Sequence, residues 1–124
     1  MEEATDIETI CFQIISFVGA AKSDYIEAMH QAKAGNYEQA EALIAQGDEA
    51  FAEGHKVHLE LLQSEAQSVV EHAKDNAGVG ADVAAGAGTP LLLVHAEDQL
   101  ASAETVKVMA LEIVSLYKKL SLKD

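Results

Sequence analysis

The chain has 124 residues, too few for a catalytic domain together with a regulatory one, so we expect a single domain spanning residues 1–124. Acidic residues outnumber basic ones 21 to 8, and the formal net charge is −13. Nucleic acid and anionic membrane surfaces would repel such a chain and are therefore poor partners. The first residues are acidic and no apolar run could span a bilayer, so we expect a cytoplasmic protein without direct membrane insertion.

The first periodic segment begins at Thr5 and ends near Ala34. Apolar residues recur in it at intervals of three and four, the spacing of a helix with one buried stripe. Thr5 and Glu8 form a capping-box pattern that predicts the start of this helix. Gly35 can adopt the left-handed conformation that ends a helix. The single cysteine, Cys11, belongs to the stripe, and we expect its thiol to be buried and inert.

A second helix is predicted over residues 37–73, with Asn36 as its N-cap. Because the connection to the first helix is so short, the two helices should pack as an antiparallel hairpin. Gly47 and Gly54 interrupt the second helix at an interval of seven and therefore share a face. Each costs about 1 kcal/mol relative to alanine in a helix interior. Close approach of a neighbouring helix is the expected compensation.

The segment from about 75 to 89 is rich in Gly and Ala and predicts a flexible loop. Its glycines match neither the dinucleotide-binding nor the P-loop spacing. A third helix is predicted over residues 90–121, with Thr89 as its N-cap and Pro90 at its first position. The predicted fold is all-α: an antiparallel, up-down-up three-helix bundle with long helices.

Three histidines are candidates for chemistry. His55 and His58 lie one turn apart on the second helix and could bind a transition metal, although we favour two polar residues on a half-exposed face. His95 follows the apolar run 91–94, which would expose apolar surface unless a partner covers it. Asp98 lies one turn after His95, close enough to influence its charge and orientation. These residues alone leave open whether His95 is structural or functional.

Residues 91–100 read Leu-Leu-Leu-Val-His-Ala-Glu-Asp-Gln-Leu. This segment resembles the signature L-[ML]-V-H-A-Q-D-H-L-M of the enzyme IIA components of the bacterial phosphoenolpyruvate:sugar phosphotransferase system, in the lactose/cellobiose/chitobiose class. Residues 31–40, 52–66 and 112–120 are also similar to this family. The resemblance extends over nearly the whole chain except the Gly/Ala-rich segment.

The chain departs from the family pattern at several positions around this signature. Glu97 stands where the family has glutamine, and Gln99 stands where it has a second histidine. On the second helix, His58 occupies a position at which the family has glutamine. The histidine of the signature, His95, is unchanged.

The resemblance implies a phosphotransferase component that acts through a phosphohistidine intermediate. His95 would accept a phosphoryl group from the histidine-containing phosphocarrier protein (HPr) and pass it to a cysteine of the cognate EIIB. The pathway would serve uptake of a β-linked disaccharide of the cellobiose, lactose or chitobiose class. The resemblance also implies a homotrimer, a nine-helix bundle in which one Asp98 per subunit binds a metal on the threefold axis. Mg²⁺ is the hard cation that suits such carboxylates.

The residues also leave room for a function of another kind. A non-catalytic helical adaptor or regulatory protein of the same fold would bind partners through the apolar run before His95 and carry no phosphoryl group. We retain it as the alternative.

Overall fold

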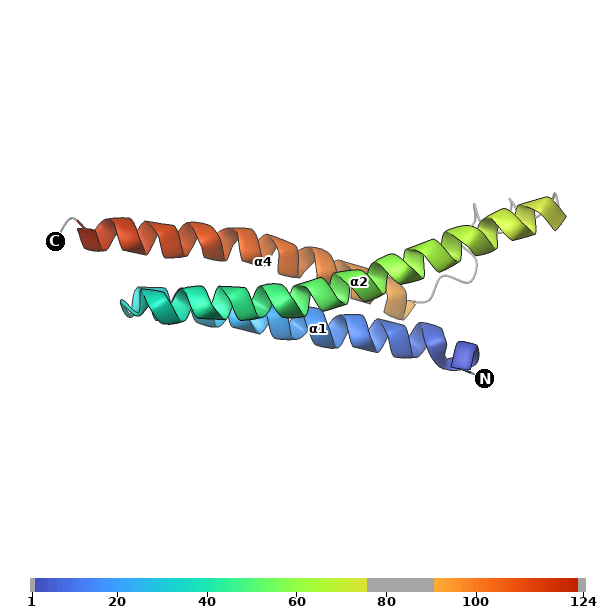
Figure 1. The fold of residues 1–124 in the computed structure, drawn as a ribbon, viewed down its shortest axis with the longest axis horizontal. Helices are drawn as coiled ribbons and strands as arrows, with labels where there is room; N and C mark the ends of the chain where they lie inside the picture. Colours follow the sequence, from blue (N-terminus) through green and yellow to red (C-terminus); the bar gives the residue numbers. More distant parts are fainter. Residues whose placement is uncertain (1, 76–90, 123–124) are drawn as a thin grey trace.

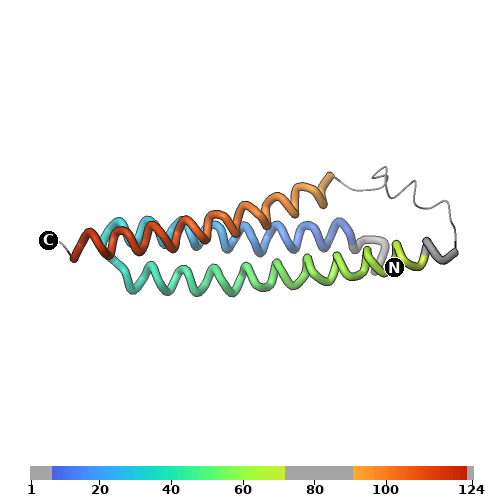
Figure 2. Tube along the Cα trace, turned by 90° about the horizontal axis from the view of Figure 1, so that it is seen from above, coloured from blue at the N-terminus to red at the C-terminus, as the bar shows by residue number. Residues whose placement is uncertain are grey.

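The structure, a computed structural model, describes residues 2–75 and 91–122, with the side chains of residues 7–71 and 91–122. These ranges form three helices: α1 (Glu2–Lys33), α2 (Tyr37–Asp75) and α4 (Leu91–Leu122). α1 and α4 run in the same direction and α2 runs in the opposite one (Figure 1, Figure 2). The predicted up-down-up three-helix bundle is confirmed. None of the three described helices has the length and hydrophobicity that a bilayer-spanning segment requires.

The start of α1 differs from the prediction. The helix begins at Glu2, so Thr5 lies within it and is not its N-cap. Acidic residues near a helix N-terminus interact favourably with the helix dipole, and positions 2 and 3 are both glutamate. This preference can start the helix upstream of the capping-box pattern.

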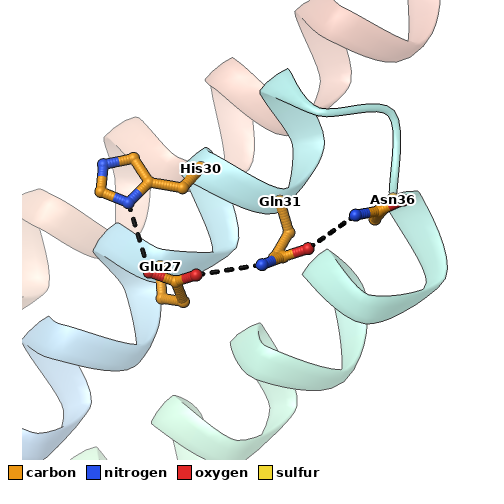
Figure 3. Close-up of polar contacts among 4 residues, drawn as sticks. All are labelled: Glu27, His30, Gln31 and Asn36. Atoms are coloured by element: carbon orange, nitrogen blue, oxygen red, sulfur yellow. Dashed lines mark hydrogen bonds and ion pairs between the residues drawn. The ribbon is translucent and has the colours of Figure 1, made fainter.

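A Schellman motif closes the turn between α1 and α2. Gly35 has the predicted left-handed conformation, with a φ of 89°. The Asn36 N–H donates to the carbonyl of Gln31 at 2.8 Å, and the Gly35 N–H donates to the carbonyl of Ala32 at 3.0 Å. The Asn36 carbonyl accepts the first bond of α2 from Ala40, as expected of an N-cap residue. The Asn36 side-chain amide donates to Gln31 Oε1 at 2.8 Å and fastens the two helix ends together (Figure 3).

Two clusters of buried side chains follow one another along the bundle. The first comprises Cys11, Ile14, Val18, Leu61, Leu93, Ala96, Leu100 and Ala103. The second, nearer the turn between α1 and α2, comprises Ala21, Tyr25, Ala28, Ala32, Ala40, Ile44, Ala110 and Val114. Alanine dominates the second cluster, and its small side chain allows the three helix backbones to approach closely there.

Two of the core residues carry polar groups. Cys11 is fully buried, as expected, and burial raises the pKa of its thiol. The Tyr25 hydroxyl donates to Asp48 Oδ1 at 2.7 Å, and Lys107 Nζ lies 3.0 Å from the same oxygen. Burial, followed by this bond to a carboxylate, raises the pKa of Tyr25. Both groups are therefore neutral at pH 7 and serve the packing of the bundle.

Gly47 and Gly54 lie where α2 packs closely against α1. A Cβ atom on Gly47 would lie 2.8 Å from Cε1 of Tyr25, and one on Gly54 would lie 2.8 Å from Cγ1 of Val18. The predicted close approach of a neighbouring helix is confirmed, and that helix is α1.

The last part of α2 extends beyond the other two helices (Figure 1). Leu61 is buried, whereas every residue from 62 to 71 is exposed. α2 ends at Asp75, two residues later than predicted. The rest of the predicted loop to residue 89, and the predicted cap at Thr89 and Pro90, lie outside the described residues.

We expect Gly54→Ala to destabilise the protein, although alanine is the better helix former. The added methyl group would meet Val18, and overpacking of this kind costs about 1–3 kcal/mol. The gain in helix propensity is only about 1 kcal/mol. Urea unfolding followed by circular dichroism measures the net change in the free energy of unfolding.

Gly19→Ala is the matched control, because a Cβ atom there would have no neighbour within 4 Å. This substitution in α1 should raise the free energy of unfolding by up to about 1 kcal/mol. Equal stabilisation by Gly54→Ala and Gly19→Ala would contradict the close approach of α1 and α2.

Candidate functional site

His95 lies in the second turn of α4, on the exposed side of the helix. The residues on either side of it in this turn anchor the backbone: Leu93 is 7% exposed and Ala96 is fully buried. The backbone of this turn is therefore held against the bundle, while the His95 side chain is exposed to solvent. The structure excludes a histidine buried in the core of one subunit and leaves the functional interpretation open.

A shallow hollow on the surface of α4 surrounds the ring. It is lined by Leu91, Leu92, Val94, His95 and Asp98. Its apolar members are well exposed, Leu91 at 83% and Val94 at 50%. An exposed imidazole among exposed aliphatic side chains can be approached by another protein, whose docking would exclude water from the ring.

Asp98 is exposed and lines the same hollow as His95, one turn further along α4. Among the described residues, its carboxylate has no hydrogen-bond or ion-pair partner. The described part of the chain also contains no group of three His, Cys, Asp or Glu residues that could hold a metal. One chain thus offers Asp98 as a single protein ligand for a metal in the part of the chain that the structure describes.

α4 is apolar on two sides. Its buried side packs in the bundle through Leu93, Ala96, Leu100, Ala103, Ala110 and Val114. Its exposed large apolar residues are Leu91, Val94, Val108, Met109, Leu111, Leu116, Leu120 and Leu122. A helix that is apolar all round is typically buried on all sides. The exposed side of α4 is therefore a candidate association surface, and His95 and Asp98 lie on it.

The two histidines of α2 have different surroundings. His58 Nε2 donates to Glu97 Oε2 on α4 at 3.0 Å, and the His58 side chain is 14% exposed. His55 is exposed, and its ring stacks on Phe51 with 6.2 Å between ring centroids. Within the described residues no third donor completes a metal site around them. The transition-metal interpretation of this pair is not supported.

The structure also brings together residues that sequence reasoning did not connect. His58 and Glu97 are 39 residues apart and both depart from the family pattern. Gln99, another departure, accepts a hydrogen bond from Lys22 Nζ of α1 at 3.3 Å. The one sequence signal that could have linked His58 to Glu97 is that both residues depart from the family pattern.

The family model of the lactose/cellobiose-specific IIA subunit of the PTS system matches residues 9–76, more than half of the chain. This match ends before His95, but full-length relatives cover the rest. The lichenan-specific phosphotransferase enzyme IIA component of Bacillus subtilis is 35% identical over 116 residues, which cover 94% of this chain and 91% of that protein. The lactose-specific EIIA component of Streptococcus mutans is 31% identical over 118 residues, which cover 95% of each.

A solved structure agrees with these sequence relatives. The crystal structure of the cellobiose-specific enzyme IIA from Bacillus anthracis superposes with a TM-score of 0.79 at 36% identity. The match covers 97% of this chain and 95% of that one. Sequence, fold and the segment around His95 lead to one conclusion: the chain belongs to the lactose/cellobiose-specific IIA family and is a component of the sugar phosphotransferase system.

Proposed function

We propose that this protein is a phosphocarrier. It accepts a phosphoryl group on His95 from phosphorylated HPr and passes it to a cysteine of the cognate EIIB, in the cytoplasm. The sugar that is finally phosphorylated is a β-linked disaccharide of the cellobiose, lactose or chitobiose class. The observation that carries the proposal is the exposed imidazole of His95, held by a well-anchored turn of α4 beside exposed apolar side chains.

The chemistry needs little beyond a neutral imidazole and a dry surface. A ring nitrogen of His95 attacks phosphorus with its lone pair, and the P–N bond to the donor histidine breaks, leaving its electron pair on the donor ring. In the second step the cysteine thiolate attacks phosphorus, and the His95 ring recovers its electron pair. Leu91 and Val94 supply an apolar surface on which the two partners dock in turn.

We also propose that the working unit is a homotrimer, with the exposed side of α4 covered by two further copies. Soluble monomers rarely expose a large contiguous apolar surface, and this helix is apolar on both sides. Three copies arranged around one axis would form a nine-helix bundle. His95 would then lie close to a boundary between subunits, still reachable by a partner.

Asp98 is the residue that would hold a metal in this trimer. It lies on the same exposed side of the helix with no partner among the described residues, and three such carboxylates on one axis would repel one another. A hard divalent cation accepts carboxylate oxygens, and Mg²⁺ fits a site with few protein ligands. When bound, the cation would neutralise the three charges and hold the subunits together.

Replacement of His95 by glutamine should abolish phosphorylation. With phosphoenolpyruvate and the general phosphotransferase proteins, the wild-type chain should gain the mass of one phosphoryl group, in an acid-labile form typical of phosphohistidine. The variant should gain none, because an amide nitrogen is not nucleophilic. Intact mass spectrometry before and after mild acid treatment measures both.

His55→Gln is the matched control, since His55 is another exposed histidine and contacts Phe51 rather than the hollow. It should be phosphorylated like the wild type. A wild-type chain that is never phosphorylated would support the adaptor instead, and labelling that survives His95→Gln would show that the nucleophile is wrongly assigned.

Removal of Mg²⁺ should weaken the trimer of the wild-type protein but not that of Asp98→Asn. The neutral asparagine amide removes the repulsion between the three side chains, so association should no longer depend on a cation. Sedimentation equilibrium with Mg²⁺ and with EDTA measures the mass of the assembly.

Glu104→Gln removes the same charge from another exposed position of α4 and should keep the Mg²⁺ dependence of the wild type. A wild-type mass of one chain under both conditions would contradict the trimer. A trimer that is equally stable with Mg²⁺ and with EDTA would contradict the metal at Asp98.

A further inference from the structure

Among the described residues, three pairs of a basic and an acidic side chain join α2 to α4 along the bundle, besides a hydrogen bond from the Tyr37 hydroxyl to the Tyr117 carbonyl. The three pairs are His58 with Glu97, Asp48 with Lys107, and Glu41 with Lys118. The order reverses along the two helices, as antiparallel packing requires. Two of the three use a lysine, whereas the contact nearest His95 uses a histidine.

The contact between His58 and Glu97 lies where the packing of α2 ends. Leu61, one turn after His58, is buried, but all residues from 62 to 71 are exposed. Beyond this point α2 separates from the other helices (Figure 1). Leu61 packs with Leu93 and Ala96 in the core just before this point, so the bond between His58 and Glu97 belongs to the last level at which α2 and α4 pack together.

Glu97 belongs to the same turn of α4 as His95. The two side chains leave the helix on different sides, because residues two apart do not share a face. A bond to Glu97 therefore leaves the imidazole of His95 free while it restrains the backbone that carries the ring. His58 is suited to this restraint, because its ring is short and stiff and only 14% of its side chain is exposed.

We propose that His58 is a positioning residue for the phosphoryl-accepting His95: through its bond to Glu97 it fixes the second turn of α4 against α2. This inference rests on the proposed function. It assigns a role to two residues that both depart from the family pattern and that the fold brings to 3.0 Å.

The protein contains a control pair of the same chemistry. His30 and Glu27 lie 3.2 Å apart on α1, with side chains that are 66% and 50% exposed (Figure 3). Both belong to one helix, near the turn to α2, so their contact does not join α2 to α4. His30→Ala therefore removes a His–Glu contact and an imidazole as His58→Ala does, without affecting the turn that carries His95.

Hydrogen exchange tests the restraint independently of phosphorylation. In His58→Ala and in Glu97→Ala, the amides of residues 95–101 should exchange about 2- to 10-fold faster, the factor expected for one hydrogen bond of typical net strength. The double variant should exchange no faster than either single variant, because one bond is lost in all three. His30→Ala should leave these amides unchanged.

Phosphoryl transfer from phosphorylated HPr tests the consequence for function. His58→Ala and Glu97→Ala should each lower kcat about 2- to 10-fold with little change in KM, since the docking residues are untouched but the imidazole is less well placed. The pair His58→Gln with Glu97→Gln should recover the wild-type rate, because two amides can rebuild the bond between the helices. His30→Ala should transfer at the wild-type rate.

Unchanged exchange and transfer in His58→Ala, additive losses in the double alanine variant, or equal losses in His30→Ala would each overturn the role of His58. In any of these cases a labelled wild-type protein leaves the phosphocarrier function standing. A wild-type protein that accepts no phosphoryl group overturns both proposals.

Discussion

α4 carries apolar side chains on two sides, and both sides are more stable when covered. The rest of the structure depends on this constraint. One side contributes Leu93, Ala96 and Leu100 to the core of the bundle. The other side presents Leu91 and Val94 to solvent. A helix with this composition can neither turn freely against α1 and α2 nor bury both sides within one chain. His95 and Asp98 lie on the side that the bundle leaves uncovered.

The close packing of α1 against α2 supports this arrangement. Gly47 and Gly54 remove the side chains that would separate the helices, and the Schellman turn at Gly35 sets their connection. The hairpin then provides a firm surface on which the core side of α4 packs. Because Ala96 is fully buried against it, the backbone that carries the neighbouring His95 is held in place.

Charge also affects how α2 and α4 pack against each other. The chain has 21 acidic and 8 basic residues, so carboxylates of α2 and α4 would tend to repel each other across the bundle. Lys107 and Lys118 relieve this repulsion by pairing with acids of α2. An individual surface ion pair contributes about 0–1 kcal/mol, so these contacts matter chiefly for how the helices align.

Local sequence predicted much of the fold but not all of the helix ends. Gly35 and Asn36 act as predicted, because a left-handed glycine and an N-cap are properties of a few adjacent residues. Thr5 was wrong as the start of α1, since a capping pattern competes with the acidic residues before it. The glycine pair of α2 correctly indicated a close neighbour.

The sequence by itself determined the family and the three helices, and it singled out His95 as the candidate residue. Only the tertiary structure decided that His95 and Asp98 face outward and that His58 meets Glu97. Periodicity tells which sides of a helix are apolar, but not which of two apolar sides its own chain will cover. A bond between residues 39 apart depends on the register in which two helices pack, and side chains from all three helices set that register together.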